Sequence, residues 1–310
     1  MDPSIVHRSL AMSKVMELAE RVAATDANVL ITGESGAGKS LLAEHLHRLG
    51  SRRDKPFVTV PCANLPAELF ESELFGHEAG AHTDATQRRI GKFEAAEGGT
   101  VFLDGVGALT SPLQAKLLRA VQERAFERLG GNDVIRIDVR FIASAHESID
   151  QEVKAGRFRE DLFYRLNVVH LRIPPLRERA DDIGPIGSHI LRQLAGRYGG
   201  GQRRLTTEAR RALRSYRWPG NVRELSNVLE SAVIATKGRD IGASVLGLAR
   251  GTPAEEVVRE AFEKRWSLDA LEVAYIKEVL KASRGNKSRA ALILGINRKT
   301  LLQKLKRAGR

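Results

Sequence analysis

The sequence predicts an α/β fold built on a parallel sheet, followed by a helical subdomain and a small all-α domain near the C-terminal end. An apolar, β-branched run, Asn28–Thr32, leads into a glycine-rich loop and then into an amphipathic stretch. This order of strand, loop and helix is that of a P-loop domain. A second apolar run, Thr100–Asp104, ends in a carboxylate, as expected for a buried parallel strand whose C-terminal end faces a ligand. Beyond residue 267 the chain changes to short helical runs separated by glycine turns.

The loop from Gly33 to Ser40 reads GESGAGKS and matches G-x-x-x-x-G-K-[ST] at every fixed position. Its glycines allow backbone N–H groups to turn inward around phosphate oxygens, and the next helix directs its positive end at the same anion. Lys39 supplies a charge for the β- and γ-phosphates, and Ser40 supplies a hydroxyl for Mg²⁺. We therefore predict an ATP site with Mg²⁺. Its loop residues are Gly33, Glu34, Ser35, Gly36, Ala37, Gly38, Lys39 and Ser40.

Asp104 is the other predicted partner of Mg²⁺, directly or through another group, because it ends the second strand at the ligand edge of the sheet. The next position is Gly105, which has no side chain to accept a proton from water. The next carboxylate forward is Glu123, which is too far along a helix to take its place. The sequence therefore predicts ATP binding and leaves hydrolysis open.

The chain divides into four predicted segments. Residues 1–173 form the α/β domain, with strands near 28–32, 57–60, 100–104, 139–144 and 168–173. Pro174-Pro175 separates it from a helical lid over residues 174–240. The predicted lid helices are Asp181–Tyr198, Thr206–Ser215 and Asn221–Thr236, and Asn221 is expected to cap the last of them. Residues 241–266 are predicted as a linker, with some helix around Ala254–Lys264, and residues 267–310 as a helix-turn-helix domain.

The C-terminal segment is strongly basic, with eleven Lys and Arg against three Asp and Glu between residues 267 and 310. Such a charge is typical of a protein that binds the phosphate backbone of DNA. The predicted helices are Leu268–Ser283, Lys287–Leu294 and Arg298–Arg307, with a tight turn at Gly295. Leu271, Ala274, Tyr275 and Val279 are expected on the inner face of the first helix, and Leu301, Leu302 and Leu305 on that of the last.

The last helix is predicted to enter the DNA groove. Asparagine, arginine and glutamine can read base edges, whereas lysine more often contacts phosphate. One such unit makes few contacts, so tight binding implies at least a dimer on a two-fold site. The predicted DNA-binding residues are Asn297, Arg298, Lys299, Thr300, Gln303 and Lys304.

Composition favours a cytoplasmic protein without a membrane partner. The 310 residues are 42% hydrophobic, and no run approaches the length of a membrane span. The single cysteine, Cys62, excludes an internal disulfide and suits a reducing compartment. It follows a predicted strand, so a buried apolar role is expected rather than reactivity.

The order of motifs resembles the AAA+ domain of bacterial enhancer-binding proteins, which activate sigma-54 RNA polymerase. The tail, GNKSRAALILGINRKTLLQKLK, is similar to the Fis-type helix-turn-helix that ends these proteins. The resemblance covers nearly the whole chain. The motifs that carry it are GESGAGKS, ESELFGHEAGA, RRIGKFEAAEGGTVFLD, LQAKLLRAVQE, VRFIASAHE, GRFREDLFYRLNVVHLRIPPLRER and WPGNVREL.

The resemblance implies further site residues. Arg159 and Arg165 match the arginines that reach into a neighbouring subunit's ATP site, where a guanidinium stabilises the departing phosphate. Without the motif they would be interpreted as a solvated helix face that pairs with nearby acids. Arg223 matches the lid arginine that senses nucleotide in the same subunit. His146 lies where a polar sensor residue ends its strand, and a structural role for this histidine is an equal alternative.

The chain departs from the family pattern at three working positions. In the loop expected to touch sigma-54, the usual GAFTGA is GAHTDA, in which an aromatic residue becomes His82 and a glycine becomes Asp84; both changes reduce apolar burial at the tip. The glutamate that usually polarises the attacking water is Gly105, and the asparagine that usually restrains it is Pro61. The loop residues are Gly80, Ala81, His82, Thr83, Asp84 and Ala85.

Three explanations remain open for the loss of the glutamate and its restraining asparagine. The chain is a decaying paralogue, or it is a regulator that binds ATP and assembles with little turnover, or another group, such as a water held by Asp104, suffices. As an active family member, the protein would form a ring, expected to be a hexamer, bind enhancer-like double-stranded DNA and hydrolyse ATP to remodel sigma-54 RNA polymerase. The alternative is a hydrolysis-deficient DNA-binding regulator, acting as a repressor or as a partner of an active relative, that uses ATP only for assembly.

Overall fold

The structure is a computed structural model that describes residues 5–63, 66–81, 85, 87–199, 201, 203–236, 238–248, 261–262, 264–283 and 285–307. The chain divides into two compact units, residues 1–246 and residues 247–310. The expected linker helix around Ala254–Lys264 lies largely outside the described residues. In the described part of the chain, no helix is both long enough and apolar enough to span a membrane.

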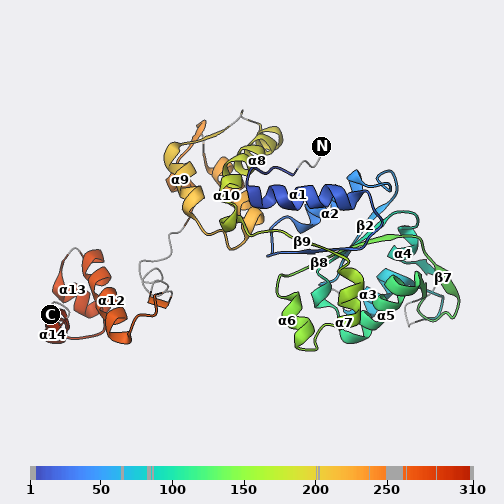
Figure 1. Ribbon diagram of the computed structural model, residues 1–310. Helices are drawn as coiled ribbons and strands as arrows, with labels where there is room; N and C mark the ends of the chain where they lie inside the picture. Colours follow the sequence, from blue (N-terminus) through green and yellow to red (C-terminus); the bar gives the residue numbers. More distant parts are fainter. Residues whose placement is uncertain are drawn as a thin grey trace. The chain divides into compact units, whose positions relative to one another are not determined.

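A five-stranded parallel sheet forms the centre of the first unit, with the order β2-β5-β8-β1-β9 (Figure 1). All five strands lie within a residue or two of their predicted positions, so these predictions are confirmed. Strand β8 lies between β1 and β5, which brings the residue after β8 between the P-loop and Asp104. The strands are β1 (Val29–Thr32), β2 (Phe57–Pro61), β5 (Thr100–Asp104), β8 (Arg140–Ala145) and β9 (Val169–Arg172).

Side chains alternate between two hydrophobic clusters on opposite faces of the sheet, as the period of a β-strand requires. On β5, Val101 and Leu103 belong to one cluster and Phe102 to the other. Helices α1 (Leu10–Ala23) and α2 (Lys39–Leu49) cover the Phe102 face. The opposite face is covered by α3 (Ala67–Phe75), α4 (Lys92–Ala95), α5 (Ser111–Glu123) and α7 (Glu160–Leu166) (Figure 1).

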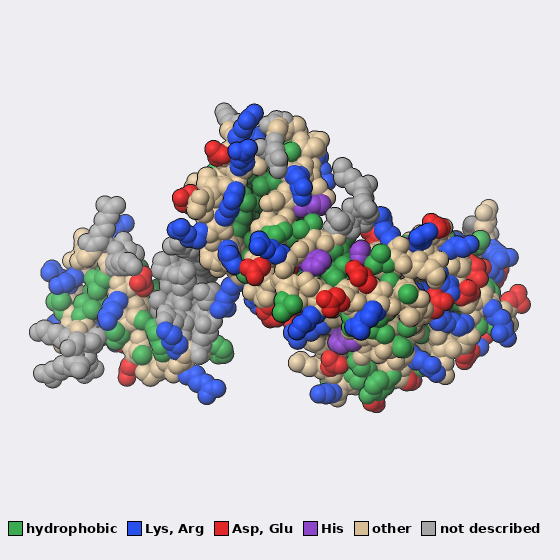
Figure 2. Space-filling model, turned by 45° about the horizontal axis from the view of Figure 1, so that its top comes forward, with side chains coloured by type: hydrophobic (Ala, Val, Ile, Leu, Met, Phe, Trp, Pro, Cys, Tyr) green, Lys and Arg blue, Asp and Glu red, His purple; other side chains and the backbone are tan. Residues whose placement is uncertain are grey.

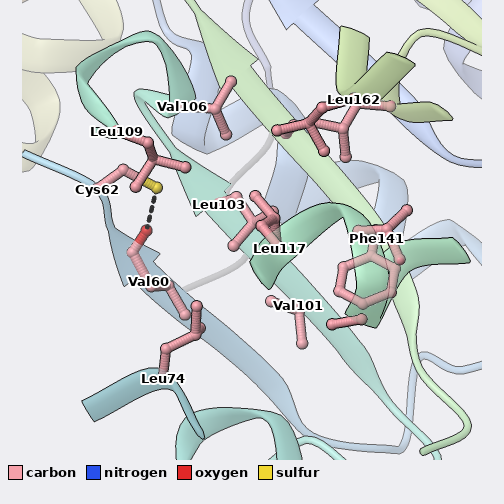
Figure 3. Close-up of a cluster of buried hydrophobic side chains, with 14 of the residues drawn as sticks. Val60, Cys62, Leu74, Val101, Leu103, Val106, Leu109, Leu117, Phe141 and Leu162 are labelled. Atoms are coloured by element: carbon pink, nitrogen blue, oxygen red, sulfur yellow. Dashed lines mark hydrogen bonds between the residues drawn. The ribbon is translucent and has the colours of Figure 1, made fainter. Parts of the chain in front are cut away.

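Figure 3 shows the larger cluster, in which Leu103 and Phe141 of the sheet face Leu117 of α5. Cys62 lies at its edge, where the thiol hydrogen-bonds the Val60 carbonyl oxygen at 3.7 Å. Burial raises the pKa of this thiol to about 12, so it stays protonated and poorly reactive at neutral pH. This agrees with the expected apolar role.

Two short hairpins and one further helix extend from the sheet domain. The hairpins are β3 (Gly76–His77) with β4 (Arg89–Ile90), and β6 (Ala125–Glu127) with β7 (Val134–Arg136). Both are antiparallel, and an isolated bridge joins His77 to Leu129, so the two hairpins lie side by side. Helix α6 (Ile149–Lys154) follows β8.

The lid begins with short 3₁₀ turns and contains α8 (Ile183–Tyr198), α9 (Thr207–Ser215) and α10 (Asn221–Ala235), which confirms the three predicted helices. The small parallel pair β10 (Arg204–Leu205) and β11 (Asp240–Ile241) closes it. Asp182, which is fully buried, accepts hydrogen bonds from the backbone of Arg8 and Ser9 and from the Ser9 hydroxyl. The start of α1 is therefore anchored to the lid. Figure 2 shows Lys and Arg side chains over much of the lid surface.

The second unit contains α12 (Leu268–Ala282), α13 (Lys287–Ile293) and α14 (Arg298–Arg307), close to the predicted bounds. Its core includes the predicted Val279 and Leu301, together with Ala290 and Ala291 of α13. The prediction for Tyr275 was wrong: its side chain is 39% exposed, and Ile276 is buried in its place. The buried residues of α13 are the small Ala290 and Ala291, and Ile276 of α12 packs against them instead of Tyr275.

Candidate nucleotide-binding site

The P-loop lies between β1 and α2 and is held against the lid. Gly36 has a φ of +73°, and a Cβ there would lie 2.3 Å from the Gly220 carbonyl oxygen, so only glycine fits. The Gly36 carbonyl oxygen accepts hydrogen bonds from the N–H groups of Val222 and Arg223 at the start of α10. The loop that would surround phosphate is thus in direct contact with the lid helix.

Lys39 turns back over the loop, as a phosphate-binding lysine should. Its Nζ donates to the carbonyl oxygens of Gly33 at 2.8 Å and Glu34 at 3.0 Å. Burial lowers the pKa of Lys39, and the nearby Asp104 carboxylate opposes that change. An incoming anion would therefore meet a partly desolvated ammonium group.

Ser40 and Asp104 meet across the gap between α2 and β5. The Ser40 hydroxyl donates to Asp104 Oδ2 at 3.4 Å, and the Ser144 hydroxyl donates to Asp104 Oδ1 at 2.6 Å. A hydroxyl and a carboxylate beside a phosphate loop are hard oxygen ligands of the kind that Mg²⁺ prefers. The residues present therefore fit this ion.

Gly105 takes the position directly after β5 with φ 82° and ψ 48°, the left-handed region. No other atom lies within 4 Å of a Cβ built there, so space for a side chain exists. Pro61 pairs in register with Asp104 across the neighbouring strands. Pro61, Asp104 and Gly105 line one cavity beside the P-loop. The two departures from the family pattern therefore lie on either side of Asp104.

His146 follows β8 and enters the same cavity. Its Nδ1 accepts the Ser148 backbone N–H at 3.3 Å and lies 3.0 Å from the Ser148 hydroxyl. Because Nδ1 acts as an acceptor, the neutral ring carries its hydrogen on Nε2. In this tautomer, Nε2 is the ring atom of His146 that can donate a hydrogen bond.

A cavity of about 740 Å³ brings these residues together. Asp104 is the only carboxylate among the described residues that line it. Arg223 reaches the cavity from α10 and donates to the Ser35 hydroxyl at 3.0 Å. The predicted residues on its wall are Ser35, Gly36, Gly38, Lys39, Ser40, Asp104, His146 and Arg223.

Glu34 turns its carboxylate toward the lid rather than into the cavity. It accepts hydrogen bonds from Arg177 at 2.7 and 2.9 Å and from the Asn221 amide at 3.0 Å. Asn221 has a φ of +51°, and its Oδ1 accepts the Leu176 N–H at 2.7 Å. The prediction that Asn221 caps α10 was wrong, because its side chain joins the P-loop to the lid instead.

Arg159 and Arg165 do not reach this cavity. Both are exposed on or beside α7, and Arg159 pairs with Asp161 at 2.7 Å. Within one subunit, both arginines are therefore solvent-exposed side chains on or beside α7, as in the alternative interpretation given above. Their predicted role in a neighbouring site stays a prediction.

The base of the loop expected to touch sigma-54 is described, and its tip is not: His82, Thr83 and Asp84 lie outside the described residues. At the base, the Gly80 N–H donates to the Ala85 carbonyl oxygen at 2.7 Å, which closes the loop. Arg128, only 8% exposed, pairs with Glu78 at 2.7 Å and with Glu94 at 2.5 Å. The hydrogen bonds that Arg128 donates to the carboxylates of Glu94 and Glu78 raise the pKa of Arg128, so this buried cation stays charged.

The predicted DNA-reading helix α14 starts at a capped turn. Asn297 Oδ1 accepts from the Thr300 N–H at 2.8 Å and from its hydroxyl at 2.9 Å. The Asn297 and Thr300 side chains therefore stabilise the N-terminal start of α14. Lys304 pairs with Glu272 at 2.6 Å. The remaining predicted residues, Arg298, Lys299 and Gln303, are exposed.

Sequence reasoning missed three residues of this site. Arg177 and the bridging role of Asn221 depend on partners more than 40 residues away, so no local pattern marks them. Ser144 is a polar residue within a buried strand, one position before its end. The available signal was a serine in a predicted buried strand, two residues before the expected sensor residue His146.

Fold and site together define a P-loop AAA+ module with a helical lid and a C-terminal helix-turn-helix. Residues 5–172 match the sigma-54 interaction domain, residues 177–256 the AAA+ ATPase lid domain, and residues 267–307 the Fis family of bacterial regulatory proteins. The chain belongs to the bacterial enhancer-binding proteins, the family of sigma-54-dependent transcriptional regulators.

Named relatives agree with this assignment. The transcriptional regulatory protein ZraR of Salmonella typhimurium is 46% identical over 303 residues, covering 98% of this chain and 68% of ZraR. FlbD of Caulobacter vibrioides, another transcriptional regulatory protein, is 43% identical over 316 residues, covering 97% of this chain and 70% of FlbD.

Solved structures of NtrX from Brucella abortus have the same fold. The NtrX complex with ATP is 36% identical and has a TM-score of 0.74, covering 99% of this chain and 69% of NtrX. The complex with ADP is 35% identical, with a TM-score of 0.75 and coverage of 100% and 70%.

Proposed function

We propose that the protein is a DNA-bound, ATP-dependent transcription regulator that couples ATP binding and hydrolysis in a ring to the remodelling of sigma-54 RNA polymerase. The observation that carries this proposal is the single cavity that joins the P-loop, Asp104, His146 and the lid residue Arg223. A nucleotide in this cavity would contact the sheet domain and the lid at once, so its phosphates would set the relation between them.

Each residue has a separate task in this proposal. The P-loop N–H groups and Lys39 bind the β- and γ-phosphates, and His146 donates to the terminal phosphate from Nε2. Ser40 and Asp104 would hold Mg²⁺, which neutralises phosphate charge when it is bound. Arg223 reports the terminal phosphate to the lid through α10.

The partners follow from the surface elements. Exposed Arg159 and Arg165 would complete the ATP site of an adjacent subunit, which requires a ring, expected to be a hexamer. The loop from Gly80 to Ala85 would contact sigma-54, and α14 would bind enhancer-like double-stranded DNA as part of a dimer or larger assembly. These partners lie in the cytoplasm, which is where we place the protein.

A second candidate is a regulator that binds ATP and assembles without hydrolysing it. It is favoured by one observation: the cavity wall offers no carboxylate except Asp104 in the described residues, and Asp104 is engaged by Ser40 and Ser144. Such a protein would act as a repressor or would join rings of an active relative.

Steady-state phosphate release by the purified protein at high concentration, with ATP and Mg²⁺, separates the two candidates. Lys39→Ala supplies the blank. Lysine-dependent turnover would support the first candidate, and ATP binding without turnover would support the second. A protein that neither binds nor hydrolyses ATP would contradict both.

A further inference from the structure

Ser144 is a polar residue beside the nucleotide site that has no role in the proposed function given above. It is fully buried near the end of β8, yet its side chain is polar. Its hydroxyl donates to Asp104 Oδ1 at 2.6 Å and accepts the Gly105 N–H at 2.9 Å. The Ser144 carbonyl oxygen also accepts the Gly105 N–H, at 3.1 Å. One residue thus holds both the carboxylate and the turn that follows it.

The hydroxyl makes the two oxygens of Asp104 unequal. Oδ1 is engaged by a short hydrogen bond from a buried donor, whereas Oδ2 faces the Ser40 hydroxyl across 3.4 Å. Rotation of the carboxylate would break the Ser144 bond and leave the buried hydroxyl without an acceptor, which is costly. The orientation of the Asp104 carboxylate is therefore fixed, with one oxygen at Ser144 and the other toward Ser40.

We propose that Ser144 is a positioning residue that orients Asp104 for the Mg²⁺ of the bound nucleotide, a role that rests on the proposed function of the cavity. The polar side chain of Ser144 in a buried strand is explained by the Mg²⁺ that its partner Asp104 would hold.

The test measures how much Mg²⁺ strengthens nucleotide binding by the full chain. A fluorescent ATP analogue is titrated in EDTA and then at increasing Mg²⁺. We expect Ser144→Ala to bind the analogue like the parent in EDTA but to need about tenfold more Mg²⁺ for half of its effect, the usual size of a loss behind a metal ligand. Ser144→Thr keeps the hydroxyl and should restore the parental Mg²⁺ midpoint.

Ser188→Ala is the matched control, because this hydroxyl bonds within α8 to the Gly184 carbonyl oxygen, away from the cavity residues. An unchanged Mg²⁺ midpoint in Ser144→Ala would overturn the inference. An equal loss of binding in EDTA and in Mg²⁺ would also overturn it, since that pattern indicates damage to the strand end. A parent that binds no nucleotide under either condition would instead refute the proposed function, and the inference with it.

Discussion

At Lys39 a partly buried ammonium group is held over the P-loop by two carbonyl oxygens. Phosphate oxygens would replace these neutral acceptors with charged ones, so the residue gains most from a bound nucleotide. We expect Lys39→Ala to weaken ATP binding by about tenfold to a hundredfold, the range for a lost hydrogen bond to a charged group. Equilibrium binding of labelled ATP checks this. Lys92→Ala is the control, because the half-exposed Lys92 side chain pairs with Glu73 at 3.8 Å and does not line the cavity. ATP affinity equal to the parent in Lys39→Ala would refute the assigned site.

Gly105 allows a direct test of the missing carboxylate. A Cβ there meets no atom within 4 Å, but the φ of +82° costs a non-glycine residue about 1–2 kcal/mol. We expect Gly105→Glu to fold with a loss of stability of that size and to raise the rate of ATP hydrolysis. Phosphate release and thermal unfolding measure the two effects, with Gly105→Glu combined with Lys39→Ala as the blank. A folded variant with no gain in turnover would show that the carboxylate is not what limits hydrolysis.

At this scale the sequence predicted residue types better than residue partners. The P-loop residues and Asp104 could be proposed as site residues from the sequence because fixed spacing and strand order mark them. Asn221 was assigned to the wrong task, since its actual partners, Leu176 and Glu34, are 45 and 187 residues away. Ser144 was missed for the same reason, because its value depends on a carboxylate on a neighbouring strand.

Glu34 is the P-loop carboxylate that hydrogen-bonds to the lid, through Arg177 and Asn221. Hydrogen bonds from Arg177 lower the pKa of Glu34 against the opposing effect of partial burial, and Asn221 adds to the lowering. Because the folded pKa lies below the unfolded one, the stabilisation is present above about pH 4.3 and is lost as pH falls through the folded pKa. We expect Glu34→Gln to lower the free energy of unfolding by about 1 kcal/mol at neutral pH and by less at pH 3.

Denaturant unfolding at both pH values checks this prediction. Glu20→Gln, on the exposed side of α1, controls for the loss of a charge elsewhere. A Glu34→Gln effect that stays constant from neutral pH to pH 3 would argue against an ionised Glu34 as the link. Weaker protection of α10 from hydrogen exchange in the variant would place the effect at the lid.

Helix α14 combines residues that read DNA with residues that build the helix. Arg298 is exposed at its start, and Asn297 and Thr300 share a capping bond. We expect Arg298→Ala to reduce affinity for a site selected from random DNA by about 1–3 kcal/mol, and to affect random DNA less. Gel-shift titrations on both DNAs measure this. An equal loss on both would indicate a phosphate contact instead.

Elements were predicted more completely than their packing. All five strands of the central sheet and the three helices of the lid follow from apolar runs and breakers in the sequence. The exposed Tyr275 shows the limit: helical spacing cannot decide which of two adjacent apolar residues faces a partner helix. That choice depends on the small residues of α13, which pack against Ile276.

For the molecule as a whole, the altered loop tests the link to RNA polymerase. His82→Phe combined with Asp84→Gly restores the usual loop tip and should increase binding to sigma-54 in a complex trapped with a transition-state analogue of ATP. Co-sedimentation or native mass measurement reports the complex. If neither the parent nor the double variant binds sigma-54 while both bind the analogue, the proposed partner is wrong.

The buried contact of Asp182 with Arg8 and Ser9 has a consequence for the order in which the chain can fold. Ser9 starts α1, but its acceptor is 173 residues further along the chain. At synthesis rates of about 5–20 residues per second, roughly 9 to 35 s separate the two. The first helix therefore leaves the ribosome without its anchor, and the sheet domain is complete only after the start of the lid has also emerged.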